Sequence, residues 1–295
     1  MRAFLFALAL TTAASAADKI KVLIIDGQNN HNWQATTPVM KSALEAAGHF
    51  EVSVSTAPPE AKKAKPEEKA ALPERWKTWK PNFSAHQVVI SNYNGEAWPE
   101  DVRKSFEAFV AGGGGFVCVH AADNAFTDWL EYNRMIGVGG WGGRTEKNGP
   151  RLYVVDGKLM RDTSPGKGGS HGPQHEFQVT TIQPEHPLMK GLPKVWMHAK
   201  DELYNSLRGP AENLQVLATA ISEQTNQAEP MVMVIDYQKG RVVHNVMGHA
   251  DYSMQCLGFQ ELLERSVEWA ATGKVDRTAA LAADFPTADK ASAAP

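Results

Sequence analysis

The sequence has little cysteine and no strong excess of charge of either sign. Only two of its 295 residues are cysteine, which excludes a small fold held together by several disulfides. Thirty lysine and arginine side chains oppose 33 aspartates and glutamates, so the formal net charge is −3. Proteins that bind nucleic acid usually carry a basic patch or a positive excess that neutralises phosphates. We therefore expect no nucleic-acid partner.

The sequence also lacks an apolar run of the roughly 20 residues that a transmembrane helix needs. A shorter apolar run, residues 4–10, follows Arg2 and precedes the A-x-A sequence Ala14-Ser15-Ala16. This order is typical of a secretory signal peptide. We therefore predict that residues 1–16 are a signal peptide and that the mature protein is periplasmic or secreted. No cysteine stands directly after the predicted cleavage site, so we expect no lipoprotein-type membrane anchor.

What is present is an ordinary globular composition, with 43% hydrophobic and 21% charged residues. Strand-like and helix-like patterns alternate over the first half. Strands are predicted at 19–26, 50–55, 87–91 and 116–120, and helices at 37–48, 99–111 and 121–136. The β-α-β-α order and the nearly continuous apolar strands favour a mostly parallel sheet with helices on both faces.

The second half is richer in strand-like segments, predicted at 152–156, 177–181, 202–204, 215–220, 231–236 and 241–247. A closing helix is expected at 257–271. We predict a single α/β domain over residues 17–272, with an elaborated second half. Residues 273–295 are rich in alanine and polar side chains, and we expect them to form a disordered tail.

Polar residues follow several of the predicted strands. In open parallel sheets, ligands bind at the carboxyl ends of the strands, so side chains at these positions should line one cleft. The candidates of this kind are His31 and Trp33 after the first strand, Asn94 and Glu96 after the third, His120 after the fourth, and His249 after a late strand.

His120 is the sharpest of these candidates. It follows a strand and precedes a predicted helix, the position at which a nucleophile elbow presents its side chain. An imidazole there suits general acid/base catalysis or metal ligation. Cys118 lies two residues earlier, so it should face the same side of the sheet at greater depth and is a poor nucleophile. A bridge between Cys118 and Cys256 is left open.

Other candidates lie in the second half. Asp201 or Glu202 would serve as a base or orient a histidine. The glycine-rich segment 137–144 would form a lid that carries Trp141 and Arg144, and Trp33 and Trp141 would stack on a sugar ring. His171 and His175 lie in a loop that fits a metal site, a substrate contact or a plain polar surface, and the spacing favours the last. Neither glycine run has a nucleotide-binding pattern, so we expect no nucleotide cofactor.

Several separated segments resemble the trehalose-utilisation (ThuA-like) family, over about residues 20–272. The matching stretches are GGGGFVCVH with two alanines after it at 112–122, His186-Pro187 through Gly191-Leu192-Pro193, Asp201-Glu202-Leu203-Tyr204, and Gly240-Arg241-Val242 leading to Gly248-His249. The resemblance implies a flavodoxin-like fold of the class I glutamine-amidotransferase-like kind. His120 stands where those amidotransferases hold their cysteine nucleophile, which argues against glutaminase activity.

The resemblance also implies a role in bacterial sugar catabolism, including oxidised disaccharides, with a metal ion in some members. We hypothesise an exported enzyme that acts on a sugar or keto-sugar. His120, His31, Glu202 and Asp201 would be its catalytic or metal-ligand residues, and Trp33, Asn94, Glu96, Trp141, Arg144, His175 and His249 would contact the substrate. A zinc or manganese ion fits the histidine content, and the identity of its ligands is left open. The alternative is a non-catalytic carbohydrate-binding protein that uses the same cleft.

Overall fold

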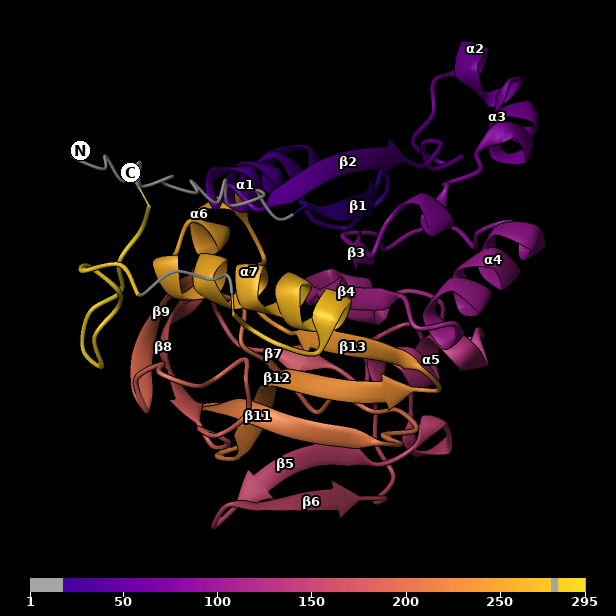
Figure 1. The fold of residues 1–295 in the computed structure, drawn as a ribbon. Helices are drawn as coiled ribbons and strands as arrows, with labels where there is room; N and C mark the ends of the chain where they lie inside the picture. Colours follow the sequence, from indigo (N-terminus) through magenta and orange to yellow (C-terminus); the bar gives the residue numbers. More distant parts are fainter. Residues whose placement is uncertain (1–17, 277–280, 295) are drawn as a thin grey trace, which may run out of the picture.

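The computed structural model describes residues 18–276 and 281–294 (Figure 1). The predicted signal peptide therefore lies outside the described residues. Within the described part of the chain, no helix is both long enough and apolar enough to cross a membrane.

The described residues form a mixed α/β fold around an eleven-stranded sheet, with the strand order β2-β1-β3-β4-β13-β12-β11-β8-β9. One half of this sheet is parallel throughout, and its strands other than the edge strand β2 are almost entirely buried. It consists of β2 (Phe50–Thr56), β1 (Ile20–Asp26), β3 (Val88–Ser91), β4 (Gly115–Val119) and β13 (Gly240–Asn245). Nearly continuous apolar runs form β1, β3 and β4, as expected for parallel strands that helices cover on both faces.

The prediction of a mostly parallel sheet is wrong for the other half. There the strands pair antiparallel: β12 (Ala228–Tyr237), β11 (Leu214–Ile221), β8 (His175–Thr181) and β9 (Val195–Asp201), with β5 (Arg151–Val155) and β6 (Lys158–Asp162) attached to β12. The connections explain the difference. Only Gln238 and Lys239 separate β12 from β13, and a link this short joins antiparallel strands but cannot make a parallel crossover.

Helices cover both faces of the parallel half, as predicted. Successive side chains of a strand point to opposite faces. A Cβ at Gly115 would meet Ala270 of α7 (Leu257–Thr272), whereas Phe116 packs against Tyr132 of α5 (Leu130–Ile136). The α1 helix (Trp33–Ala46) contacts α7 on the first face, and α4 (Glu100–Ala111) lies with α5 on the second. Three shorter helices are α2 (Pro66–Lys69), α3 (Leu72–Thr78) and α6 (Asp251–Met254).

Two helix boundaries differ from the sequence prediction. The first helix begins at Trp33 rather than Thr37, because the carbonyl of Asn32 already accepts hydrogen bonds from Ala35 and Thr36; Pro38 therefore lies inside the helix. The predicted helix at 121–136 is instead a 3₁₀ turn, His120–Asn124, followed by a loop and α5. Strand β9 was missed, and the strand expected at 202–204 is the short β10 (Tyr204–Asn205), which pairs with β7 (Ser170–His171).

The described part of the predicted disordered tail is hydrogen-bonded to the domain. Residues 281–294 donate and accept backbone hydrogen bonds with Met197 of β9 and with residues 255–257, and Phe285 packs against Trp196. The segment binds the open edge strand β9, which alanine-rich composition alone did not reveal. Cys118 and Cys256 are both buried and free, so no disulfide joins them.

Candidate functional site

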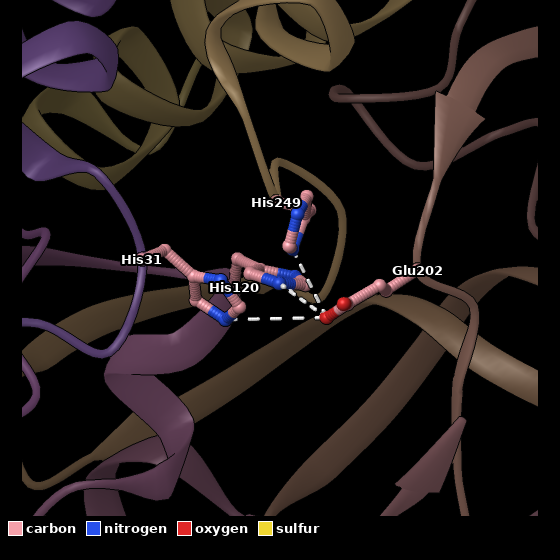
Figure 2. Close-up of side chains that lie close together, drawn as sticks. All are labelled: His31, His120, Glu202 and His249. Atoms are coloured by element: carbon pink, nitrogen blue, oxygen red, sulfur yellow. Dashed lines mark ion pairs between the residues drawn. The ribbon is translucent and has the colours of Figure 1, made fainter. Parts of the chain in front are cut away.

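Four side chains meet at the carboxyl ends of the parallel strands (Figure 2). They are His31 after β1, His120 after β4, His249 after β13, and Glu202 directly after β9. One ring nitrogen from each histidine and a carboxylate oxygen of Glu202 all lie within 4.8 Å of one another. Glu202 Oε2 is 3.0 Å from His249 Nδ1, 3.6 Å from His120 Nε2 and 3.9 Å from His31 Nε2. We refer to these four side chains as the His₃Glu cluster.

The backbone and a carbonyl fix His120 in the cluster. The residue has a φ of +46°, a left-handed conformation that is uncommon for a residue other than glycine and typical of functional sites. Its Nδ1 donates to the carbonyl of Val246, at 2.8 Å. With Nδ1 bound in this way, Nε2 faces Glu202, 3.6 Å from its Oε2.

The buried carboxylate of Asp201 holds the Glu202 side of the cluster in place. Its Oδ1 accepts from the backbone N–H of Glu202 at 2.7 Å and of His249 at 3.0 Å. Its Oδ2 accepts from the N–H of Gly248 and from Nε2 of His198, both at 2.7 Å. Asp201 is fully buried and uses its oxygens on these four donors, so it positions the cluster rather than acting as a base.

Burial and mutual charge set the protonation of these groups. Burial disfavours charge on Asp201 and His198, but the bond between them raises the pKa of His198 to about 9 and lowers that of Asp201. Burial and the neighbouring His120 and His249 lower the pKa of His31 to about 3. Burial would raise the pKa of Glu202, yet the surrounding imidazoles outweigh it and lower that pKa. At neutral pH the cluster therefore presents a carboxylate and a neutral His31 ring.

The donor atoms of the cluster fit a metal ion. His120 Nε2, Glu202 Oε2 and His249 Nδ1 are buried, and apart from their ion-pair contacts with one another they have no hydrogen-bond partner among the described residues. Buried polar atoms are normally satisfied, so three such atoms that face one point call for a missing partner. Three imidazole nitrogens and one carboxylate oxygen are ligands that zinc and other first-row divalent ions accept. The His₃Glu cluster could therefore hold a metal ion.

Three further side chains border the cluster: Tyr204, His171 and Trp141. Only Trp141 is among the substrate contacts predicted from the sequence. Tyr204 is buried, its hydroxyl lies 3.2 Å from His31 Nε2, and its ring packs on His120. His171, which pairs across from Tyr204, brings Nε2 to 3.7 Å from Glu202. Trp141 packs against both of these rings. The sequence around His171 and Tyr204 predicts neither the pairing of β7 with β10 nor the burial of Tyr204.

The remaining predicted residues lie elsewhere. Arg144 is buried, and its guanidinium donates to Asn133 and to three backbone carbonyls, so it is not free to contact a substrate. His175 packs on Phe177 and lies outside the cluster. Trp33 lies in the first turn of α1, two residues beyond His31. Asn94 and Glu96 line a separate cavity beside the cluster.

Comparison with known proteins gives one family and a close structural relative. A family model described as trehalose utilisation, ThuA, matches residues 21–270. The chain is similar to a putative ThuA-like protein from Parabacteroides merdae, with 43% sequence identity and a TM-score of 0.86 over 94% of this chain and 98% of that one. No curated protein matches the sequence.

More distant structures share the fold alone. A putative ThuA-like protein from Bacteroides uniformis is 20% identical, with a TM-score of 0.55 over 90% of this chain and 96% of that chain. The carbohydrate deacetylase Agd3 is 11% identical, with a TM-score of 0.52 over 86% of this chain and 33% of its own.

The first prediction concerns metal binding. We expect the purified protein to bind one zinc or manganese ion per chain, and His120→Ala to weaken this affinity about 100-fold or more by removing one ligand. Affinity should fall as the pH is lowered, because protons compete with the metal for the ring nitrogens. Burial disfavours the charged form of His120, but its contact with Glu202 outweighs this and raises the pKa of that ring. Competition with a chromophoric chelator measures both effects. His86→Ala, far from the cluster, is the matched control, and equal affinities in the two variants would exclude this site.

The second prediction concerns Asp201. In Asp201→Asn, an amide NH₂ group replaces one acceptor oxygen and faces N–H donors that it cannot bind. We therefore expect the unfolding free energy to fall by about 2–4 kcal/mol. Metal affinity should fall about 10- to 100-fold because Glu202 and His249 lose their support. Urea unfolding and metal titration test the two effects. Asp236→Asn, at an exposed position, is the control; unchanged metal affinity in folded Asp201→Asn would refute the positioning role.

Proposed function

The chain belongs to the ThuA family, described as trehalose utilisation, and from this membership and the His₃Glu cluster we propose that it is an enzyme of carbohydrate catabolism. Its substrate is a sugar or keto-sugar, and its cofactor is a divalent metal ion held by His31, His120, Glu202 and His249. The reaction is a hydrolysis, elimination or isomerisation assisted by that ion. Export to the periplasm or medium belongs to the same proposal; its support is the N-terminal sequence, and mass spectrometry of the mature N-terminus tests it.

One observation carries the proposal of a metal enzyme. The unsatisfied atoms of His120, Glu202 and His249 are buried and converge from three elements that are distant in the sequence. Each buried polar atom without a partner costs about 1–3 kcal/mol, so three that converge on one point support a ligand that compensates for them. When bound, a zinc or manganese ion would supply Lewis-acid polarisation of a sugar oxygen.

This arrangement changes the roles expected from the sequence. His120 and Glu202 are better suited as ligands than as acid/base groups, because their unpartnered atoms face one another. His31 brings its Nε2 to the same point, where it also contacts the Tyr204 hydroxyl. Asp201 positions them. His171 is the imidazole outside the His₃Glu cluster, and its side chain is the most exposed of the group at 35%. Its Nδ1 lies 2.8 Å from the carbonyl of Gly172, which orients Nε2 toward the cluster, where it can exchange a proton with a bound substrate.

The wall beside His171 suits a sugar. Trp141 is only partly buried, and its ring centroid lies 4.6 Å from that of the buried Tyr204 ring. Sugar rings stack on partly exposed aromatic rings such as that of Trp141 through their apolar faces. The Tyr204 hydroxyl lies beside the cluster, where it can donate to a sugar oxygen. Its pKa is raised by burial and by nearby carboxylates, so the group keeps its proton.

A cysteine-dependent reaction has no support in this site. Cys118 is fully buried beneath the cluster, and burial raises the pKa of its thiol, so no thiolate is presented to a substrate. The His120 side chain occupies the strand-end position in its place. These observations favour a chemistry other than that of a glutamine amidotransferase.

The third prediction separates an enzyme from a binding protein. Purified protein should turn over at least one member of a panel of disaccharides and their keto forms, with a rate that falls at least about 100-fold on chelation and returns when zinc or manganese is restored. Product formation is followed by mass spectrometry. A chelator-treated sample without added metal is the control. Sugar binding without any product, with or without metal, would instead support the carbohydrate-binding alternative.

A further inference from the structure

The cavity lined by Asn94 and Glu96 adjoins the His₃Glu cluster. Its volume is about 380 Å³, within the range of small-molecule sites. Two segments line it, one after β2 and one after β3, together with the residue before His31. The polar side chains on its walls are Asn30, Glu60, Lys62, Lys63, Asn94 and Glu96. We infer that this cavity is a binding subsite for an uncharged, polyhydroxylated ring, such as one hexose unit.

A buried glutamine builds both walls of this cavity. The Gln28 side chain donates to the carbonyl of Pro58 at 2.7 Å on one wall and accepts from the N–H of Glu96 at 2.7 Å on the other. Its backbone carbonyl accepts from the N–H of Asn94. A Cβ at Gly95 would lie 2.2 Å from the Gln28 side chain, so the loop can pack there only with glycine. The cavity is therefore formed before any ligand arrives, which lowers the entropic cost of binding.

The charges on the walls balance. Glu60 Oε2 lies 3.3 Å from the ammonium groups of both Lys62 and Lys63. The carboxylate of Glu96 instead accepts from the backbone N–H of Ala61. Two carboxylates and two ammonium groups line the cavity, so its formal net charge is zero. What the walls offer is a dense set of hydrogen-bond donors and acceptors, which suits hydroxyl groups because each hydroxyl both donates and accepts.

Asn30 connects the cavity with the cluster. Its Oδ1 accepts from Asn94 Nδ2 at 2.6 Å, while its Nδ2 lies 3.0 Å from Nε2 of His31. A molecule in the cavity is thus separated from the cluster by a single amide side chain. This inference rests on the proposed function only for the identity of the ligand as a carbohydrate. It implies that the substrate has a neutral sugar unit beyond the part that meets the cluster.

The test reads binding on chelator-treated protein, so it does not depend on metal or on turnover. The probes are methyl β-D-glucopyranoside and the anionic sugar D-glucuronate, followed by saturation-transfer NMR and calorimetry. We expect the neutral glucoside to bind more tightly than glucuronate. Asn94→Ala should weaken glucoside binding about 3- to 10-fold by removing one hydrogen-bonding group. Asn82→Ala, an exposed asparagine outside the cavity, is the matched control.

A second variant tests the charge argument. Glu60→Gln removes the partner of Lys62 and Lys63, so it should strengthen glucuronate binding about threefold or more and leave the glucoside nearly unchanged. Circular dichroism and thermal unfolding confirm that each variant is folded. The subsite would be overturned if the glucoside did not bind at all. It would also be overturned if Asn94→Ala left glucoside binding unchanged and Glu60→Gln left glucuronate binding unchanged. A bound glucoside in a protein that shows no turnover would instead contradict only the proposed enzyme.

Discussion

The site depends on the hydrogen bonds of one buried carboxylate. Asp201 ends β9 and binds the turn after β13 through the backbone N–H groups of Gly248 and His249, and it also binds the N–H of Glu202. The two elements come from the two differently built halves of the sheet. His198 supplies the positive charge that makes a fully buried carboxylate tolerable. This link places Glu202 opposite the histidines that follow the parallel strands.

The two halves of the sheet contribute different parts of the chemistry. The parallel half delivers His31, His120 and His249 to one edge, since parallel strands place all their carboxyl ends on the same side. Glu202 follows β9, an antiparallel strand, and the separate two-stranded β7–β10 ribbon carries His171 and Tyr204. The parallel strands thus provide imidazole nitrogens, and the other strands provide the carboxylate, the imidazole proposed to exchange a proton, and the Tyr204 hydroxyl. An elaborated second half is therefore part of the site rather than an addition to it.

The sequence predicted the parts of the fold that are local and repetitive. Apolar runs located β1, β3 and β4, and the strand-end rule placed His31, His120 and His249 at one edge, where the structure brings them together. Long-range pairing has no comparable local signal. The order of the antiparallel strands, the edge position of β9 and the pairing of His171 with Tyr204 depend on contacts between distant segments. Arg144 shows the same limit, because only the packed structure reveals that carbonyls surround its guanidinium.

The proposed metal site at the His₃Glu cluster can be tested by anomalous diffraction from crystals grown with zinc, recorded on both sides of the zinc absorption edge. We expect one strong peak per chain, bonded to His31 Nε2, His120 Nε2, His249 Nδ1 and a carboxylate oxygen of Glu202, at roughly 2.0–2.2 Å for zinc. A well-ordered cluster without a peak, at zinc concentrations that saturate binding in solution, would show that these four side chains do not hold the ion.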